Sequence, residues 1–125
     1  MPTVLIVDDH PAIRKALRDY FERSNLAECG EAVNGLDAID KAKQLNPDLV
    51  LLDFSMPVMN GIEAAQALKE VMPGVPVFML TAYFGACMQL LAKDAGVSGV
   101  FSKDDVAPMV HRARAVLHHP RLNGV

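Results

Sequence analysis

Polar residues follow four apolar segments of this sequence at the points where those segments end. They are Asp8 and Asp9 after VLIV, Asp53 after LVLL, Thr81 after VFML, and Lys103, which Ser102 separates from Gly99-Val100-Phe101. Carboxylates that lie together repel one another unless a cation neutralises them, and Mg²⁺ prefers such oxygen ligands. A hydroxyl and an ammonium group can hold phosphate oxygens, and a carboxylate such as Asp53 can attack phosphorus. The residue types therefore indicate phosphoryl transfer at a Mg²⁺ site.

The apolar segments themselves indicate how these groups come together. Continuous runs of Val, Leu and Ile without polar alternation are typical of parallel strands buried on both faces. Parallel strands end at the same edge of their sheet, where open α/β sheets bind ligands. Segments with helical spacing of apolar residues separate the runs, which predicts five β-α repeats. We expect an α/β fold with a single five-stranded parallel sheet and helices on both faces.

The element boundaries follow from Pro, Gly and Asn punctuation and from the apolar spacing. Strands are expected at 4–7, 31–33, 49–53, 75–80 and 97–101. Helices are expected from Pro11, across 38–45 and 62–72, across 84–95 with Gly96 as its C-cap, and from about Asp105. In the first helix we place Arg14, Arg18, Asp19 and Glu22 on the solvent side. In the fourth helix we place Met88, Leu91 and Ala92 on the inward side.

Composition limits the classes of protein that fit. The chain has 125 residues, of which 51% are hydrophobic and 22% charged, as expected for one globular domain. A net charge of −3 gives no reason to expect nucleic-acid binding by this domain. No apolar run approaches the roughly 20 residues of a membrane span, and no signal peptide is evident, so we expect a cytoplasmic location without membrane contact. Cys29 and Cys87 are expected to be reduced, half-buried thiols.

Each residue of the candidate cluster also has a simpler structural explanation. Asp9 or Thr81 could cap a helix, Asp8 could end a strand in solvent, Asp53 could be a turn residue, and Lys103 could be a surface lysine. These explanations do not account for five complementary groups at equivalent strand ends. His10, which adjoins the acidic pair, is expected to be a loop residue rather than a metal ligand.

In combination, the segments VLIVDDHP, DLVLLDFSMPVMNG, VFMLTA and VFSKDD resemble the receiver domain of two-component response regulators from Thr3 to Leu117. The resemblance implies a flavodoxin-like, doubly wound (βα)5 fold and phosphorylation of Asp53 by a histidine kinase or a phosphotransfer protein. It implies that Asp9, Asp53 and the Ser55 carbonyl bind Mg²⁺ directly, with Asp8 acting mainly through water. It also implies that Thr81 and Lys103 hold the phosphoryl oxygens.

The sequence departs from the family pattern on the fifth strand. The aromatic residue that usually lies three positions before the lysine is replaced by Val100, and Phe101 is expected to point to the opposite face. The pair Lys103-Asp104 resembles the sequence found in one branch of the family, whose receivers precede a NarL-type DNA-binding domain. Ser55 and Tyr83, two positions after Asp53 and Thr81, are where this family tunes the access of hydrolytic water. We expect Tyr83 to shield the phosphoryl group.

The expected function is a phosphorylation-controlled switch in signal transduction and transcriptional regulation. Such a chain is no enzyme for other substrates, because it catalyses only its own phosphorylation and dephosphorylation. The expected receiver domain covers residues 1–118, and 119–125 form a tail or linker stub. The sequence leaves open a homodimer and a DNA-binding output domain outside this chain. It also leaves open a phosphate-independent interaction module. A Mg²⁺-dependent phosphohydrolase is less favoured, because Ser55 stands where a second acid would be needed.

Overall fold

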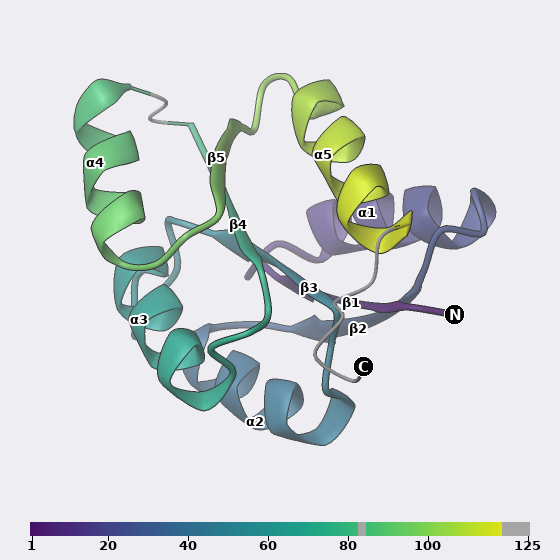
Figure 1. Ribbon diagram of the computed structural model, residues 1–125, viewed down its shortest axis with the longest axis horizontal. Helices are drawn as coiled ribbons and strands as arrows, with labels where there is room; N and C mark the ends of the chain where they lie inside the picture. The colour runs from purple at the N-terminus through teal and green to yellow at the C-terminus, as the bar shows by residue number, and fades with distance from the viewer. Residues whose placement is uncertain (83–84, 119–125) are drawn as a thin grey trace.

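Five parallel strands form one sheet at the centre of the computed structural model (Figure 1). The structure describes residues 1–82 and 85–118. The strands, in the spatial order β2-β1-β3-β4-β5, are β1 (Thr3–Val7), β2 (Glu28–Ala32), β3 (Leu49–Asp53), β4 (Val77–Thr81) and β5 (Gly99–Ser102). The helices between and after them are α1 (Pro11–Arg23), α2 (Gly35–Leu45), α3 (Gly61–Val71), α4 (Ala86–Asp94) and α5 (Ala107–His118).

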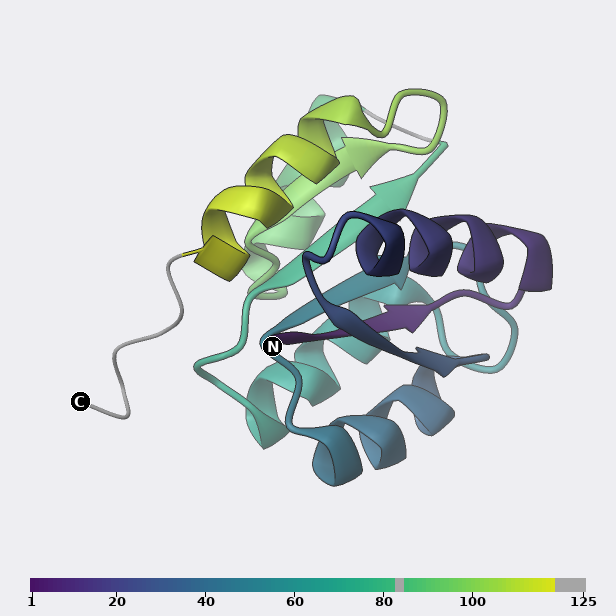
Figure 2. The same cartoon turned by 90° about the vertical axis from the view of Figure 1, so that its right-hand side faces the viewer.

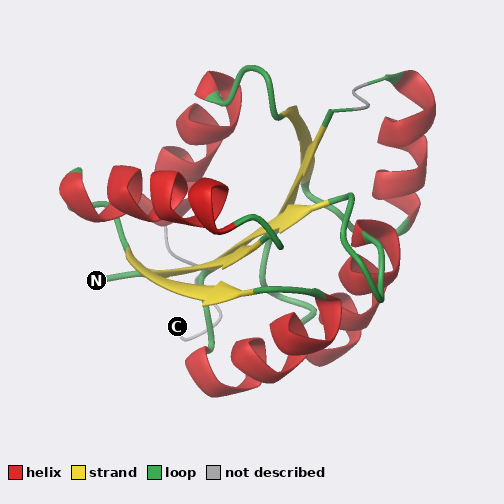
Figure 3. Ribbon diagram, turned by 180° about the vertical axis from the view of Figure 1, so that it is seen from behind, coloured by secondary structure: helices red, strands yellow, loops and turns green. Residues whose placement is uncertain are grey.

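The helices cover both faces of the sheet, so that it is the middle layer of three (Figures 1 and 3). On one face, α1 and α5 pack over a core that includes Phe21, Phe78 and Met109. On the other face, α2, α3 and α4 pack over a second core that includes Leu52 and Leu68. The central strands are apolar throughout because they are buried on both sides. The predicted α/β fold with a five-stranded parallel sheet is confirmed.

The carboxyl ends of the strands lie at one edge, as the parallel strand arrows in Figure 2 show. The register aligns Val7 of β1 with Leu52 of β3, and Asp53 with Leu80 of β4. Asp8, the residue after β1, therefore comes to the level of Asp53, and Thr81, the last residue of β4, lies one residue further along. In this strand order, the strand that follows β1 is added on one side of it, and the strands that follow β3 are added on the other side. Sheets of this kind bind ligands in the crevice at such a switch point.

Local signals fix several of the helix ends. Asn60 Oδ1 accepts a hydrogen bond from the Glu63 amide at 2.9 Å, and Glu63 Oε1 accepts one from the Asn60 amide at 3.1 Å. This reciprocal capping box starts α3 directly after the β3–α3 loop. Gly96 was expected to be the C-cap of α4, but Ala95 is the C-cap and Gly96, with φ +87°, is the residue directly after it.

Several predicted boundaries were wrong. The second strand was expected at 31–33 but lies at Glu28–Ala32. The prediction failed because this edge strand contains charged residues and a glycine, which obscure the alternation of apolar and polar residues. The fourth starts at Val77 rather than at 75, because Pro76 has no amide hydrogen for the ladder. The fifth lies at Gly99–Ser102, and α4 covers Ala86–Asp94 rather than 84–95.

Two predicted side-chain environments also differ from the structure. Leu91 was expected to face inward but is 50% exposed, whereas Ala92 is buried and Met88 packs partly against the core. Cys29 is buried and Cys87 is exposed, so neither free thiol is half-buried. The predicted shielding residue Tyr83 and the predicted tail at 119–125 lie outside the described residues. Within the described ranges, none of the helices combines the length and apolar character that a membrane span requires.

Val58, in the β3–α3 loop, has a backbone conformation that is unfavourable for its side chain. Its φ is 73° and its side chain is exposed, so no burial offsets the steric cost of a β-branched residue in the left-handed region. We expect Val58→Asn to raise the free energy of unfolding by about 1 kcal/mol, because asparagine tolerates this region. Urea unfolding measures the change.

The matched control for this substitution is Val33→Asn. Val33 is also solvent-exposed, but it is not among the described residues with positive φ. Its replacement is expected to change the free energy of unfolding by less than about 0.5 kcal/mol. Equal effects of the two substitutions would contradict the assignment of strain to Val58.

Candidate functional site

Three of the predicted groups meet at the carboxyl edge of the sheet. Lys103, directly after β5, places its Nζ 2.7 Å from Asp53 Oδ1 and 3.6 Å from Asp8 Oδ2. Asp8 and Asp53 are both 1% exposed, and the Lys103 side chain is 21% exposed. Residues from β1, β3 and the end of β5 thus form one buried cluster with two carboxylates and one ammonium group.

The acidic residues retain unused oxygen acceptors. Within the described part of the chain, Asp8 Oδ2, Asp9 Oδ1 and Asp53 Oδ2 are buried and accept no hydrogen bond, although Lys103 Nζ lies 3.6 Å from Asp8 Oδ2 and His10 Nδ1 lies 3.1 Å from Asp9 Oδ1. Ligand atoms of Asp8, Asp9, His10 and Asp53 all lie within 4.8 Å of one another. Buried carboxylate oxygens without donors are costly, and they are the ligands that a hard divalent cation such as Mg²⁺ prefers. The donor set therefore fits Mg²⁺.

The loop after β3 approaches the Asp53 carboxylate closely. The Ser55 amide donates a hydrogen bond to Asp53 Oδ1 at 3.2 Å, and the Gly61 amide donates to the Phe54 carbonyl at 2.8 Å. A Cβ at Gly61 would lie 2.7 Å from Phe54 Cα and 2.8 Å from the Asp53 carbonyl oxygen. Glycine is therefore needed where α3 begins, because any side chain would displace the backbone that carries Asp53.

Thr81 lies at the end of β4, beside Asp53. It is 1% exposed, and its carbonyl oxygen accepts a hydrogen bond from the Lys103 amide at 3.0 Å. This backbone contact joins the ends of β4 and β5. The structure thus brings Thr81 to the same edge as Asp8, Asp53 and Lys103, as the spacing of the apolar runs predicted.

The charges in the cluster shift each other's ionisation. Burial raises the pKa of Asp53 above its usual range, although the hydrogen bond from Lys103 offsets part of that rise. Burial lowers the pKa of Lys103, but the hydrogen bond and charge of Asp53 and the charge of Asp8 more than compensate, so the net pKa is raised. Lys103 is therefore cationic at neutral pH, and an ionised Asp53 is held at a cost to stability that a bound cation would reduce.

His10 contacts the acidic pair from the solvent side. It is a loop residue before α1, as predicted, and its side chain is 60% exposed. Its Nδ1 lies 3.0 Å from Asp8 Oδ1 and 3.1 Å from Asp9 Oδ1, and its amide donates to Asp8 Oδ1 at 2.9 Å. Sequence reasoning did not anticipate these contacts.

The simpler explanations of the cluster residues do not match the structure. The N-cap of α1 is His10 rather than Asp9, and the N-cap of α4 is Gly85 rather than Thr81. Lys103 pairs with buried carboxylates instead of extending into solvent. Asp53 does accept a local hydrogen bond from the loop, but only one of its two oxygens is used in this way.

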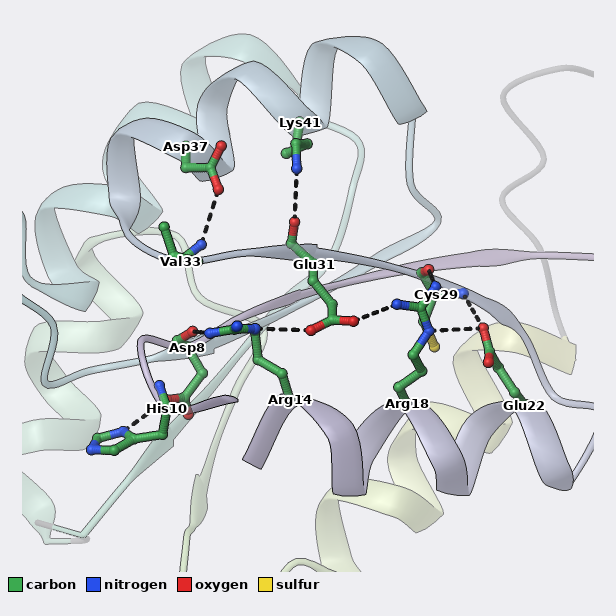
Figure 4. A network of polar contacts seen from close by, with 10 residues as sticks. All are labelled: Asp8, His10, Arg14, Arg18, Glu22, Cys29, Glu31, Val33, Asp37 and Lys41. Atoms are coloured by element: carbon green, nitrogen blue, oxygen red, sulfur yellow. Dashed lines mark hydrogen bonds and ion pairs between the residues drawn. The ribbon is translucent and has the colours of Figure 1, made fainter. Parts of the chain in front are cut away.

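Arg14 also lies in this region, and the exposure predicted for its side chain was wrong. It was assigned to the solvent side of the first helix, but its side chain is only 14% exposed. Its Nη1 donates to the Asp8 carbonyl at 2.7 Å, and its Nε donates to Glu31 Oε1 at 2.8 Å (Figure 4). Arg18, one turn later, donates to Glu31 Oε2 and, at 2.9 Å, to the Cys29 carbonyl. Both arginines are therefore held against β2.

This arginine pair should make stability depend on pH. Burial raises the pKa of Glu31, but hydrogen bonds from Arg14 and Arg18 outweigh it and lower the pKa below its usual value of 4.5. A lowered pKa stabilises the fold above the unfolded-state value, and this contribution is lost as pH falls through the folded-state value. We expect Glu31→Gln to lower the free energy of unfolding by about 1 kcal/mol at pH 7. Urea unfolding should show this difference shrinking below about pH 4.5.

Glu28→Gln is the control for this substitution, because Glu28 lies on the same strand and is exposed. The Glu28→Gln substitution is expected to leave the free energy of unfolding nearly unchanged, both at pH 7 and below about pH 4.5. A Glu31→Gln difference that stayed constant as the pH was lowered would contradict the assignment to the ionised carboxylate.

The fifth strand places its aromatic residue away from the cluster, as predicted. Phe101 packs on the α1 and α5 side, where its ring centroid is 5.2 Å from that of Phe78. Val100 packs against the opposite core with α2, α3 and α4. The two residues thus lie on opposite faces of the sheet, and Val100, three positions before Lys103, is aliphatic.

Comparison with known proteins places these features in one family. The sequence profile of the response regulator receiver domain matches residues 4–114. The transcriptional regulatory protein LnrK of Bacillus subtilis is 35% identical over 119 residues, which are 94% of this chain and 54% of LnrK. The response regulator protein VraR of Staphylococcus saprophyticus is 38% identical over 111 residues, or 88% of this chain and 53% of VraR. The chain thus spans about half the length of these relatives.

Solved structures have the same architecture. A LuxR-family two-component response regulator from Aurantimonas has a TM-score of 0.87 at 29% identity, over 97% of this chain and 88% of that one. The chemotaxis protein CheY4 of Vibrio cholerae has a TM-score of 0.81 at 27% identity, over 90% of this chain and 98% of that one. The flavodoxin-like arrangement expected from the sequence is confirmed.

Proposed function

The chain belongs to the family of response regulator receiver domains, and on that ground we propose that it is a phosphorylation-controlled switch whose phosphoacceptor is Asp53. Receiver domains are signalling switches rather than metabolic enzymes. The observation that carries the proposal is the buried Asp53 carboxylate, which is paired with Lys103 at 2.7 Å through one oxygen and accepts no described hydrogen bond at the other.

The transfer that we propose is a displacement at phosphorus. A carboxylate oxygen of Asp53 forms the new O–P bond while the P–N bond to the donor phosphohistidine breaks, and the leaving imidazole keeps the electron pair and is protonated. Lys103 is positioned to neutralise charge on the phosphoryl oxygens, and we assign the Thr81 hydroxyl to donate a hydrogen bond to one of them. The same groups would serve the later hydrolysis of the acyl phosphate, so the chain catalyses only its own phosphorylation and dephosphorylation.

We propose that Mg²⁺ is the cofactor, held by Asp9, Asp53 and the Ser55 carbonyl, with Asp8 acting mainly through water. The support is the set of buried acceptor oxygens on Asp8, Asp9 and Asp53. Bound Mg²⁺ supplies positive charge for the phosphoryl oxygens and relieves repulsion between the carboxylates. The chain's own residues then orient the acceptor, because the Ser55 amide and Lys103 both contact Asp53 Oδ1.

Phosphorylation would shift an equilibrium of the face formed by α4, β5 and α5. Because Val100 replaces the usual aromatic residue, the proposed change does not involve the rotation of an aromatic side chain at this position. The Lys103 amide bond to the Thr81 carbonyl gives a direct link between the phosphate-binding groups and β5.

The relatives suggest what the switch controls. LnrK is named a transcriptional regulatory protein and VraR a response regulator, and the chain corresponds to about half of each. We propose residues 1–118 as the receiver, 119–125 as a tail or linker, and a DNA-binding output domain as partner in a cytoplasmic transcription factor. A sensor histidine kinase or phosphotransfer protein would be the donor. A homodimer of this chain is a further proposal.

The test is intact-mass detection of phosphorylation by a small acyl-phosphate donor, with and without Mg²⁺. We expect the mass of one phosphoryl group to be added with Mg²⁺ and little or none after chelation, because the crowded carboxylates need the cation. Labelling that was insensitive to chelation would contradict the Mg²⁺ site. No labelling of a folded, Mg²⁺-binding chain would favour the phosphate-independent interaction module instead.

A further inference from the structure

We propose that Arg14 is a positioning residue for the acidic pair, so that it sets the affinity of the site for Mg²⁺ without contacting the ion. The inference rests on the proposed function, because it concerns the same site. It goes beyond that function by assigning a role to a residue of α1 that lies outside the phosphate and metal contacts.

The side chain of Arg14 bridges two acceptors that belong to different strands. Nη1 donates to the backbone carbonyl of Asp8 at 2.7 Å, directly after β1, and Nε donates to Glu31 Oε1 of β2 at 2.8 Å. Figure 4 shows the guanidinium group between these two acceptors. Only a planar guanidinium offers several donors in fixed directions, so a bridge of this kind depends on arginine.

The bridge completes the support of Asp8. The ladder between β1 and β3 ends at Val7, and the Asp8 amide donates to the Ala32 carbonyl at 3.1 Å, which fixes the peptide before Asp8. Arg14 fixes the carbonyl of the peptide that joins Asp8 to Asp9. The peptides on either side of Asp8 are therefore held by Ala32 of β2 and by Arg14, while the His10 amide holds the Asp8 carboxylate itself.

Glu31 and Glu22 together balance the charge of this support. A free guanidinium beside the site would repel a divalent cation, but Glu31 pairs with both Arg14 and Arg18, and Glu22 also pairs with Arg18. Glu31 is itself held on β2, where Lys41 Nζ donates to its carbonyl oxygen at 3.1 Å. The charge of Arg14 is thus balanced locally while its geometry acts on Asp8.

Arg18 provides a matched control within the same network. It lies one helical turn after Arg14, pairs with the same Glu31 and donates to a strand carbonyl, but that carbonyl belongs to Cys29 rather than to Asp8. Removal of either arginine breaks the pair with Glu31 and one bond to the backbone, and removal of Arg18 also breaks its exposed pair with Glu22. Only the removal of Arg14 takes a hydrogen bond away from the backbone of the acidic pair.

The experiment is calorimetric titration of the whole chain with Mg²⁺ for the unmodified protein, Arg14→Ala and Arg18→Ala, with urea unfolding of each. We expect both variants to lose similar stability. Arg14→Ala should bind Mg²⁺ about tenfold more weakly, as is typical when a group that orients a metal ligand is removed. Arg18→Ala should keep the unmodified affinity. Phosphorylation of Arg14→Ala should be slow at limiting Mg²⁺ and recover most of its rate at saturating Mg²⁺.

Equal Mg²⁺ affinity of the two variants would overturn the positioning role and leave the network merely structural. If Arg14→Ala does not fold, Arg14→Lys takes its place, because lysine lacks the planar group that directs separate donors to the two acceptors, and an unmodified affinity of that variant would then overturn the proposal. An unmodified chain that bound no Mg²⁺ would instead refute the proposed function itself.

Discussion

Asp53→Asn is expected to carry no phosphoryl group after incubation with an acyl-phosphate donor and Mg²⁺, whereas the unmodified chain gains one. The substitution keeps the size of the side chain but replaces a carboxylate oxygen by an amide, which is a poor nucleophile and a poor metal ligand. Asp53 is 1% exposed, and Lys103 and the Ser55 amide hold its Oδ1 in place. Intact-mass spectrometry checks the result.

Asp104→Asn is the control, because Asp104 follows Lys103 but is exposed. It should be labelled like the unmodified chain. The Asp53 variant should also remain folded. Because the pKa of Asp53 is raised by burial, the stabilisation from its protonated carboxyl is fully present below the unfolded-state pKa and is lost as pH rises through the folded-state pKa. Its ionised form is therefore a cost at neutral pH. Labelling of a folded Asp53→Asn chain would refute Asp53 as the acceptor.

Lys103→Met is expected to slow phosphorylation by the same donor about 100-fold at saturating Mg²⁺. In the described part of the chain, Lys103 is the one cation that pairs with Asp53, at 2.7 Å, so its loss leaves charge on the phosphoryl oxygens without a nearby ammonium group. Methionine keeps most of the aliphatic stem, so packing at the end of β5 should change little. The rate of mass increase measures the effect.

Mg²⁺ affinity distinguishes this role from damage to the site. Because Lys103 lies 3.6 Å from Asp8 and closer to Asp53, its charge opposes a divalent cation among the same carboxylates. Lys103→Met should therefore bind Mg²⁺ at least as tightly as the unmodified chain. Lys93→Met, an exposed lysine of α4, should change neither quantity. An unchanged phosphorylation rate in Lys103→Met would contradict its role, and weaker Mg²⁺ binding would indicate a collapsed site.

The sequence predicted those parts of the fold and site that depend on buried, regular elements. The strand at 49–53 has the predicted bounds, because five successive buried residues, LVLLD, leave no ambiguity of period. The position of Asp53, Thr81 and Lys103 at one edge follows from parallel strands alone, once each residue is known to end a strand. The edge strand β2 begins three residues before and ends one residue before the predicted bounds, because its pattern, ECGEA, has no clear apolar run.

The parts that the sequence did not predict depend on contacts between distant elements. Helical spacing assigned Arg14 to solvent, since its charge suits an exposed face, but the acceptors that hold it lie on β1 and β2. The contacts of His10 depend on where the chain turns after β1. Leu91 was assigned inward on apolar character, whereas the buried residues here are the small Ala92 of α4 and Ala95 directly after the helix.

The two thiols allow the switch to be observed without altering the chain. Cys29 is buried, and burial raises its pKa to about 11, so at neutral pH it should resist alkylation. Cys87 is exposed in the first turn of α4, on the face expected to respond to phosphorylation. A maleimide-linked fluorophore or spin label should therefore attach at one position only. Its emission or mobility would then report, in real time, on the movement of α4 when the acyl phosphate forms.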